Sequence, residues 1–284
     1  MKTAQLLWQA ITPVHVGTGQ DSSSVIDLPV AREAGTKYPY IPASSIKGVF
    51  RDGEDLDDPD GKPFIVTQAR QRFGYADRPA SDPSSKETPG TSGIGDLTFT
   101  DARILCLPVP SLVGTYALVT CPLVLERMMR DRELLGFTKR NLPSPPDESS
   151  AITTNELLSL GGKVILSDLD FTAKVDTGLA SFWKDVTGCE SDRLCLIPDD
   201  AFSFLCETSL QVMAHIRLDP GTKTVKQGAL WYEESLPAET LLTSFMISQS
   251  GDLTLAYEHP WMQLGGKSTT GQGMMALHVL ESEA

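Results

Sequence analysis

The segment VIDLPVAREAGTKYPYIPASSIKGVFRD, residues 25–52, changes its hydrophobic period halfway along its length. Residues 25–31 form a short β-prone run, and Tyr38–Pro42 is extended because a residue that precedes proline avoids the helical region. Over Ser44–Arg51, apolar residues instead recur at helical spacing. We therefore expect extended chain followed by an amphipathic helix.

Strand and helix patterns also alternate in the rest of the sequence. Residues 210–218 alternate apolar and polar side chains, DPGT then turns the chain, and TVKQGALWYEE returns, which predicts a β-hairpin over about 210–234. Mixed strands with few helices indicate an α+β fold, a single domain over residues 1–284 with insertions at about 52–95 and 136–160. Further strands are expected at 4–11, 96–109, 164–175 and 274–280, and further helices at 122–135 and 198–206.

The composition is typical of a soluble cytoplasmic protein. No apolar run approaches the roughly 20 residues that span a bilayer, and the N-terminus lacks a secretion signal. The five cysteines, an odd number without C-x-x-C spacing, are expected to be reduced thiols. With 24 basic against 37 acidic residues, the net charge is −13. This charge weakens a nucleic-acid interpretation without excluding it, because basic clusters occur around Arg70 and Arg127.

A glycine-rich loop, Leu264–Gly273, contains the string GGKST. It is not a P-loop, because the glycine required five residues before the G-K pair is replaced by Trp261 and the following MMALHVL is strand-like. Such a loop can still present backbone N–H groups and Lys267 to phosphates. The alternative is a flexible hairpin connection.

The start of the expected helix is a second candidate anion site. Ser44 or Ser45 can cap this helix, and Lys47 and Arg51 add positive charge on one face. Free N–H groups at a helix start favour anions. The alternative is simple capping with a solvated basic face.

Asp27 and His15 are candidates for proton transfer. A carboxylate within V-I-D-L-P, beside a glycine loop that carries His15, can bind a metal ion or move a proton. The alternatives are a turn-capping aspartate and a hydrogen-bonded structural histidine.

In combination, the segments resemble one family from about residue 5 to residue 280. The chain resembles the RAMP superfamily, and within it the backbone subunits of type III-B CRISPR RNA-guided effector complexes. It departs from the family pattern at Ala43, where glycine is more usual. The segments that carry the resemblance are TPVHVGTG, VIDLPVAREAGTKYPYIPASSIKGVFRD, GDLTFTDARILCLPV, VTCPLVLER, IRLDPGTKTVKQGALWYEESLP and QLGGKSTTGQG.

The resemblance implies a ferredoxin-like or RNA-recognition-like palm with inserted fingers and a thumb hairpin at about 210–234. It implies copies stacked head to tail along a guide RNA, beside other subunits of the complex, and a single-stranded target RNA as substrate. The thumb wedges into the guide–target duplex at regular intervals. The residues implied in RNA binding are Ser44, Ser45, Lys47, Arg51, Met213, Arg217, Gly265, Gly266, Lys267, Ser268, Thr269 and Gln272.

The resemblance also implies an endoribonuclease. Asp27 matches the aspartate on which target cleavage depends, with His15 and Glu233 or Glu234 as auxiliary residues. A divalent metal ion, Mg²⁺ or Mn²⁺, is an expected cofactor whose ligands are not assigned. Two alternatives stay open, namely a non-catalytic guide-binding scaffold and a guide-processing RAMP endoribonuclease.

Overall fold

The computed structural model describes the chain except residues 18, 20–24, 57–67, 77–91 and 284. Residues 57–60 of the acidic run at 52–60 and residues 77–91 of the Pro-, Ser- and Gly-rich stretch at 77–95 lie outside the described residues.

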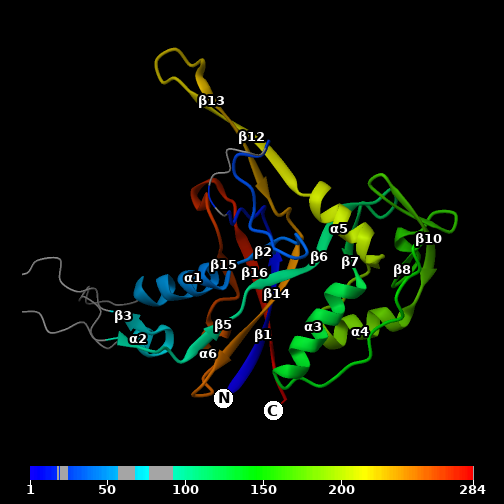
Figure 1. Cartoon of the computed structure of the whole chain (residues 1–284), viewed down its shortest axis with the longest axis horizontal. Coiled ribbons are helices and arrows are strands. Elements are labelled where there is room, and N and C mark those ends of the chain that lie inside the picture. Colours follow the sequence, from blue (N-terminus) through cyan, green and yellow to red (C-terminus); the bar gives the residue numbers. More distant parts are fainter. Residues whose placement is uncertain (18, 20–24, 57–67, 77–91, 284) are drawn as a thin grey trace, which may run out of the picture.

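A mixed 12-stranded sheet runs through the molecule, which confirms an α+β fold (Figure 1). The strand order is β15-β16-β1-β14-β6-β7-β11-β8-β10-β9, with β2 paired to β6 and β5 paired to β14. The strands of this sheet are β1 (Lys2–Ala10), β2 (Tyr40–Ile41), β5 (Leu97–Phe99), β6 (Ala102–Pro110), β7 (Tyr116–Thr120), β8 (Ser150–Thr153), β9 (Lys163–Leu166), β10 (Leu169–Val175), β11 (Leu194–Leu196), β14 (Leu241–Ser248), β15 (Trp261–Gln263) and β16 (Met274–Glu281).

The helices include each of the three that the sequence predicted. Figure 1 shows α3, α4 and α5 gathered beside the part of the sheet that contains β7, β8 and β10. None of the described helices is long and apolar enough to cross a membrane. The helices are α1 (Ala43–Leu56), α2 (Gln68–Phe73), α3 (Pro122–Leu134), α4 (Thr177–Thr187), α5 (Asp199–Thr208) and α6 (Thr254–Glu258), with short 3₁₀ turns η1 (Glu156–Leu158) and η2 (Ser268–Thr270).

Four strands form an antiparallel unit at the centre of the sheet, in the order β16-β1-β14-β6. The register is continuous along β1, where Leu6 lies opposite Ser244 on one side and Val279 on the other. In the chain, α1 lies between β1 and β6, and α6 lies between β14 and β16.

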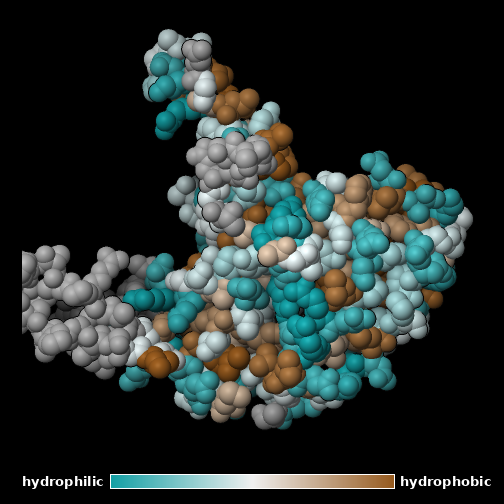
Figure 2. All heavy atoms as spheres, viewed as in Figure 1, coloured by the Kyte–Doolittle hydropathy of each residue, from teal (hydrophilic) through white to brown (hydrophobic). Residues whose placement is uncertain are grey.

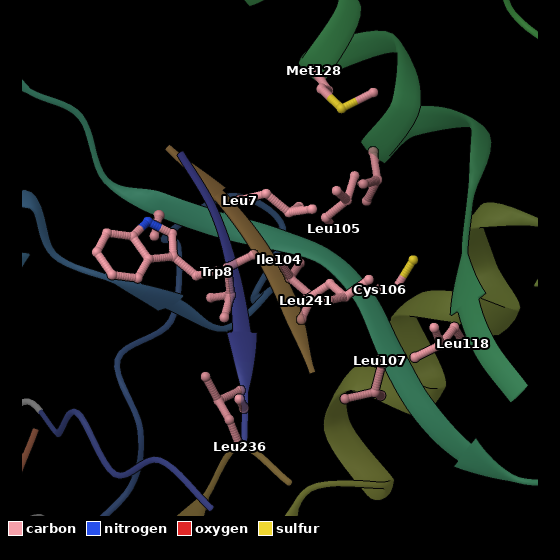
Figure 3. Close-up of a cluster of buried hydrophobic side chains, with 14 of the residues drawn as sticks. Leu7, Trp8, Ile104, Leu105, Cys106, Leu107, Leu118, Met128, Leu236 and Leu241 are labelled. Atoms are coloured by element: carbon pink, nitrogen blue, oxygen red, sulfur yellow. The ribbon is translucent and has the colours of Figure 1, made fainter. Parts of the chain in front are cut away.

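The hydrophobic core covers both faces of this unit, because side chains alternate along each strand. Trp8 points to one face, where its ring lies 6.1 Å from that of Phe50 on α1. Leu7 and Leu105 point to the other face, toward Met128 on α3 (Figure 3). Burying each such side chain contributes roughly 1.5–3 kcal/mol, so the helices are fixed on both sides of the strands.

A separate two-stranded sheet, the hairpin of β12 (Gln211–Leu218) and β13 (Val225–Ser235), projects from the body (Figure 1). This confirms the predicted hairpin and its turn, in which one Asp219 carboxylate oxygen accepts the N–H groups of Gly221 and Thr222 at 2.9 Å each. Apolar side chains lie along one edge of it (Figure 2). The last two strands, β3 (Tyr75–Ala76) and β4 (Ser92–Gly93), pair with each other.

Two local predictions need correction. Helix α1 begins at Ala43, so Ser44 and Ser45 lie within its first turn, and a carboxylate oxygen of Asp101 accepts the Ala43 N–H at 2.8 Å. Residues 25–31 do not form a regular strand, because they make only single bridges to other described segments of the protein.

Candidate active site

The base of the hairpin positions Asp27. A carboxylate oxygen of Asp27, Oδ2, accepts the backbone N–H of Tyr232 at 2.8 Å. The next residue, Leu28, pairs with the same stretch of β13, donating its N–H to the Tyr232 carbonyl at 3.1 Å and accepting the Glu234 N–H at 3.0 Å. The Asp27 side chain is half-buried. The carboxylate is therefore fixed at one oxygen while its side chain stays accessible.

His15 is bound to the same strand, two residues further along. Its Nδ1 lies 2.6 Å from the carbonyl oxygen of Glu234, and because a carbonyl only accepts, Nδ1 carries the proton. In the neutral ring, Nε2 is then an acceptor. A Cβ atom at Gly17 would lie 2.7 Å from this Nε2, so glycine makes room for the imidazole. The anchors of Asp27 and His15 are two residues apart, or roughly 7 Å along the strand.

Glu233, between these two anchors, is the buried counterion of Lys267. Its side chain is 1% exposed, and Oε2 forms an ion pair with the Lys267 ammonium. Lys267 Nζ also lies 3.1 Å from Nε2 of His215. Since an ammonium only donates, this nitrogen accepts and His215 is neutral. The His215 ring stacks on Trp231 with centroids 5.4 Å apart. Lys267 thus ties the glycine loop to both strands of the hairpin.

Glu234 is held differently, by the chain segment that follows Asp27. Its Oε1 accepts from the Arg32 guanidinium at 2.7 Å, and its Oε2 accepts the Val30 N–H at 3.1 Å. The side chain is 5% exposed. Both oxygens are therefore engaged within the protein.

The glycine loop lies directly against the His15 segment. The Gly266 N–H donates to the His15 carbonyl at 3.1 Å, and the Gly273 N–H donates to the Pro13 carbonyl at 2.8 Å. Gly265 has a φ of 82°, and a Cβ there would lie 2.2 Å from the His15 oxygen, so only glycine allows this approach. Ser268 and Thr269 are exposed on the loop, whereas Gln272 is buried.

The remaining predicted residues lie outside this cluster. Ser44, Ser45, Lys47 and Arg51 are on α1, where only Ser44 is fully exposed and the others are half-buried. On the hairpin, Met213 is half-buried opposite Glu233, and Arg217 is exposed beside an irregularity of the register.

The sequence reasoning missed three members of the site, namely Arg32, His215 and Trp231. Arg32 lies in the same motif as Asp27, but its partner on β13 is 202 residues away in the chain. The alternation of the hairpin residues hinted at His215, because it places positions 213, 215 and 217 on one face, and Trp231 lies opposite His215 in the register of the hairpin.

The donors at this site do not form a metal cage. In the described part of the chain, no group of three or more His, Cys, Asp and Glu side chains is placed to hold a metal ion. Glu233 and Glu234 are each paired with a cation. The arrangement fits only an ion that takes one protein ligand, Asp27, and its other ligands from a bound phosphate and water, as Mg²⁺ often does.

The arrangement can perform acid–base chemistry at a phosphate. It brings together a carboxylate, an imidazole with an acceptor nitrogen, an ammonium and an exposed hydroxyl-bearing loop, all at the base of one projecting hairpin. Of the site residues predicted from the sequence, Asp27, His15, Glu233, Glu234 and Lys267 are brought together here.

A family model described as the RAMP superfamily matches residues 9–275. The chain belongs to the RAMP superfamily. Within it, the chain is 33% identical over 291 residues to the "CRISPR system Cmr endoribonuclease Cmr4" of Pyrococcus furiosus, covering 95% of this chain and 93% of that protein. This identity places it in the Cmr4 family. The "CRISPR system CMR subunit Cmr4" of Saccharolobus solfataricus is 22% identical over 96% of this chain and 94% of its own.

Solved structures of RAMP proteins have the same fold. The crystal structure of oligomeric Cmr4 from Pyrococcus furiosus matches with a TM-score of 0.73 and 27% identity, over 99% of each chain. A chain in the cryo-EM structure of the type III-B Cmr-beta bound to cognate target RNA matches with a TM-score of 0.72 and 21% identity, over 98% of this chain and 96% of that one. The second likeness concerns the fold alone.

Proposed function

We propose that this chain is the endoribonuclease backbone subunit of a cytoplasmic type III-B CRISPR effector complex, which binds guide RNA and cleaves complementary target RNA. The observation that carries the proposal is the placement of Asp27 on Tyr232, beside His15 and Lys267, in a chain 33% identical to a Cmr4 endoribonuclease. The catalytic roles and RNA contacts below are parts of the same proposal.

The order of the central strands supports a ferredoxin-like palm. Numbered along the chain, β1, β6, β14 and β16 lie in the spatial order 4-1-3-2, all antiparallel, with α1 and α6 as the two crossover helices. In this proposal the hairpin of β12 and β13 is the thumb. The insertions at about 52–95 and 136–160 are the fingers.

The RNA contacts are to the backbone, because base pairing with the guide reads the sequence. The N–H of Gly266 and the ammonium of Lys267 are already engaged within the chain, so the exposed Ser268 and Thr269 make the direct contacts of the glycine loop. Gly265, Lys267 and Gln272 shape that loop. The other contacts come from Ser44, Ser45, Lys47 and Arg51 on α1 and from Met213 and Arg217 on the hairpin.

Copies of the chain stack along the guide in this proposal, and other Cmr subunits complete the complex. The similar Cmr4 of Pyrococcus furiosus, whose crystal structure is of an oligomer, supports this arrangement. The substrate is a single target strand paired with the guide. The projecting hairpin separates one nucleotide of this strand from its neighbours.

Cleavage proceeds by in-line attack of a ribose 2′-oxygen on the adjacent phosphorus. Asp27 accepts the 2′-hydroxyl proton as the P–O bond forms. His15 acts in its imidazolium form, in which Nδ1–H stays bound to the Glu234 carbonyl and Nε2 gives its proton to the 5′-oxygen as the second P–O bond breaks. The products are a 2′,3′-cyclic phosphate and a 5′-hydroxyl. A nucleotide splayed out of the duplex reaches this geometry more easily than a stacked one.

A divalent ion, Mg²⁺ or Mn²⁺, is part of the proposal as a cofactor. In this alternative role, Asp27 would hold the ion instead of accepting the proton, and the ion would stabilise the negative charge that develops on the phosphate oxygens.

The test is single-turnover cleavage of labelled target RNA by assembled complex carrying Asp27→Asn. The amide oxygen of asparagine can still accept the Tyr232 N–H, so assembly and target affinity should be unchanged while cleavage falls at least ~100-fold. The matched control is Asp176→Asn, because Asp176 also accepts one backbone N–H, from Gly178 at 2.8 Å, but caps α4. Normal cleavage by a folded Asp27→Asn complex would remove Asp27 from the mechanism and promote His15 or the Glu233–Glu234 pair in its place.

A further inference from the structure

The segment from Asp27 to Arg32 is attached to β13 by backbone hydrogen bonds near Asp27 and by contacts with one side chain of β13 near Arg32. Nearest to Asp27, backbone hydrogen bonds join Leu28 to Tyr232 and Glu234. Further along, the contacts use the Glu234 side chain, which accepts from the Val30 N–H and from the Arg32 guanidinium. The Arg32–Glu234 pair is the only ion pair between this segment and β13 among the described residues.

Arg32 connects three parts of the molecule through one planar group. Besides Glu234 on β13, its Nη1 donates to the carbonyl of Lys37 and to the carbonyl of Cys206 on α5, each at 3.0 Å. Cys206 lies in the last turn of that helix, where unpaired carbonyls favour a cation. The guanidinium therefore fixes the far end of the Asp27 segment against α5 and β13 together.

Glu234 is placed to hold this segment and cannot reach a substrate. Its residue is 3% exposed, and both carboxylate oxygens are engaged within the chain. A group that accepts or donates a proton in the reaction needs direct contact with the RNA. Glu234 thus lacks the access that Asp27 has.

We propose that Arg32 and Glu234 are positioning residues that set the location of the Asp27 carboxylate. The inference rests on the proposed function of Asp27. Loss of Arg32 leaves the buried Glu234 with the Val30 N–H alone and frees the segment from α5. The resulting displacement reaches Asp27 through the segment from Asp27 to Arg32, and a displacement of about 1 Å at a reacting group can cost ~100-fold in rate.

The experiment compares assembled complexes carrying Arg32→Gln, Arg32→Lys and the control Arg193→Gln. Arg193 is a half-buried arginine that also donates to backbone carbonyls, those of Gly114 and Tyr116, but outside the site. Single-turnover cleavage is measured below the melting temperature of every variant. The rate constant, the amplitude and the target affinity are read separately.

We expect Arg32→Gln to lower the rate constant about 10- to 100-fold, with amplitude and target affinity unchanged. Lysine keeps a charge for Glu234 but replaces the planar guanidinium, whose two nitrogens reach the three oxygens, with a single ammonium nitrogen, so Arg32→Lys should have an intermediate rate constant. Arg193→Gln should keep the wild-type rate constant. If Arg32→Gln does not assemble, Arg32→Lys decides the question.

A merely structural role predicts a different pattern. Variants of Arg32 would then lose amplitude, because fewer complexes fold, while the folded fraction would cleave at the wild-type rate constant. That outcome overturns the inference and leaves the function of Asp27 intact. Normal cleavage by Asp27→Asn would instead refute the proposed function of Asp27, so the two failures are distinguishable.

Discussion

Replacing Lys267 with methionine tests the buried ion pair that joins the glycine loop to the hairpin. The variant leaves the Glu233 carboxylate, which is 1% exposed, without its cation, whereas Lys267 itself is 28% exposed. Removing one partner of a buried pair costs about 3–5 kcal/mol, because the remaining charge stays buried and uncompensated. The partial exposure of Lys267 favours the lower end of this range.

A loss of ~3 kcal/mol in the free energy of unfolding corresponds to a fall in Tm of about 6–12 °C, because domains of 150–250 residues typically lose 2–4 °C per kcal/mol. The assay is thermal unfolding of the isolated subunit, followed by circular dichroism. The control is Lys174→Met, which breaks an ion pair with Asp147 of comparable length whose side chains are 52% and 59% exposed. An exposed pair contributes about 0–1 kcal/mol, so this control should change Tm by at most a few degrees.

The double variant Glu233→Met/Lys267→Met completes the test. It removes both charges and keeps side chains of similar size. Replacing a buried ion pair by apolar groups often leaves the free energy of unfolding unchanged, so we expect most of the lost stability to return. Equal Tm values for Lys267→Met and Lys174→Met would refute the argument. So would a double variant no more stable than Lys267→Met.

Two further predictions concern RNA binding and the positions of cleavage. Lys47→Gln should weaken the binding of every guide sequence and reduce the slope of log K against log salt by about one. Filter binding at several salt concentrations measures both effects. A loss of affinity confined to one guide would contradict backbone readout. Replacing Asp219–Thr224 at the turn of the hairpin with Asn-Gly should leave the Tm of the subunit nearly unchanged, because the turn is exposed, while the cleavage positions on denaturing gels become less regular. Unfolding of this variant would instead show that the hairpin stabilises the body of the protein.

The elements predicted correctly from the sequence are those with a strong internal period. The alternation in β12, the helical spacing in α1 and the proline at the first turn of α3 are properties of short windows, so they are visible without tertiary structure. The prediction missed β11, whose three residues are all buried, because a short apolar run has no period. Its position is set by pairing with β7 and β8, which the local sequence does not encode.

The same limit applies to the site. Asp27 and His15 were predicted because each lies in a recognisable short motif. The contacts that define their surroundings are long-range, with 205 residues between Asp27 and Tyr232 and 219 between His15 and Glu234. The predicted capping of α1 by a serine failed for a related reason, since the group at its first N–H, Asp101, is 58 residues further along the chain.

The pairing of charges at the site separates the acidic residues by role. Glu233 is neutralised by Lys267 and Glu234 by Arg32, so these two carboxylates add little negative charge to the candidate active site despite the net charge of −13. Within the described part of the chain, Asp27 has a backbone N–H as its partner and no cation. Asp27 is thus the carboxylate of this cluster that no side-chain cation neutralises. The glutamates therefore act as internal counterions, and Asp27 is the carboxylate that the proposed mechanism uses.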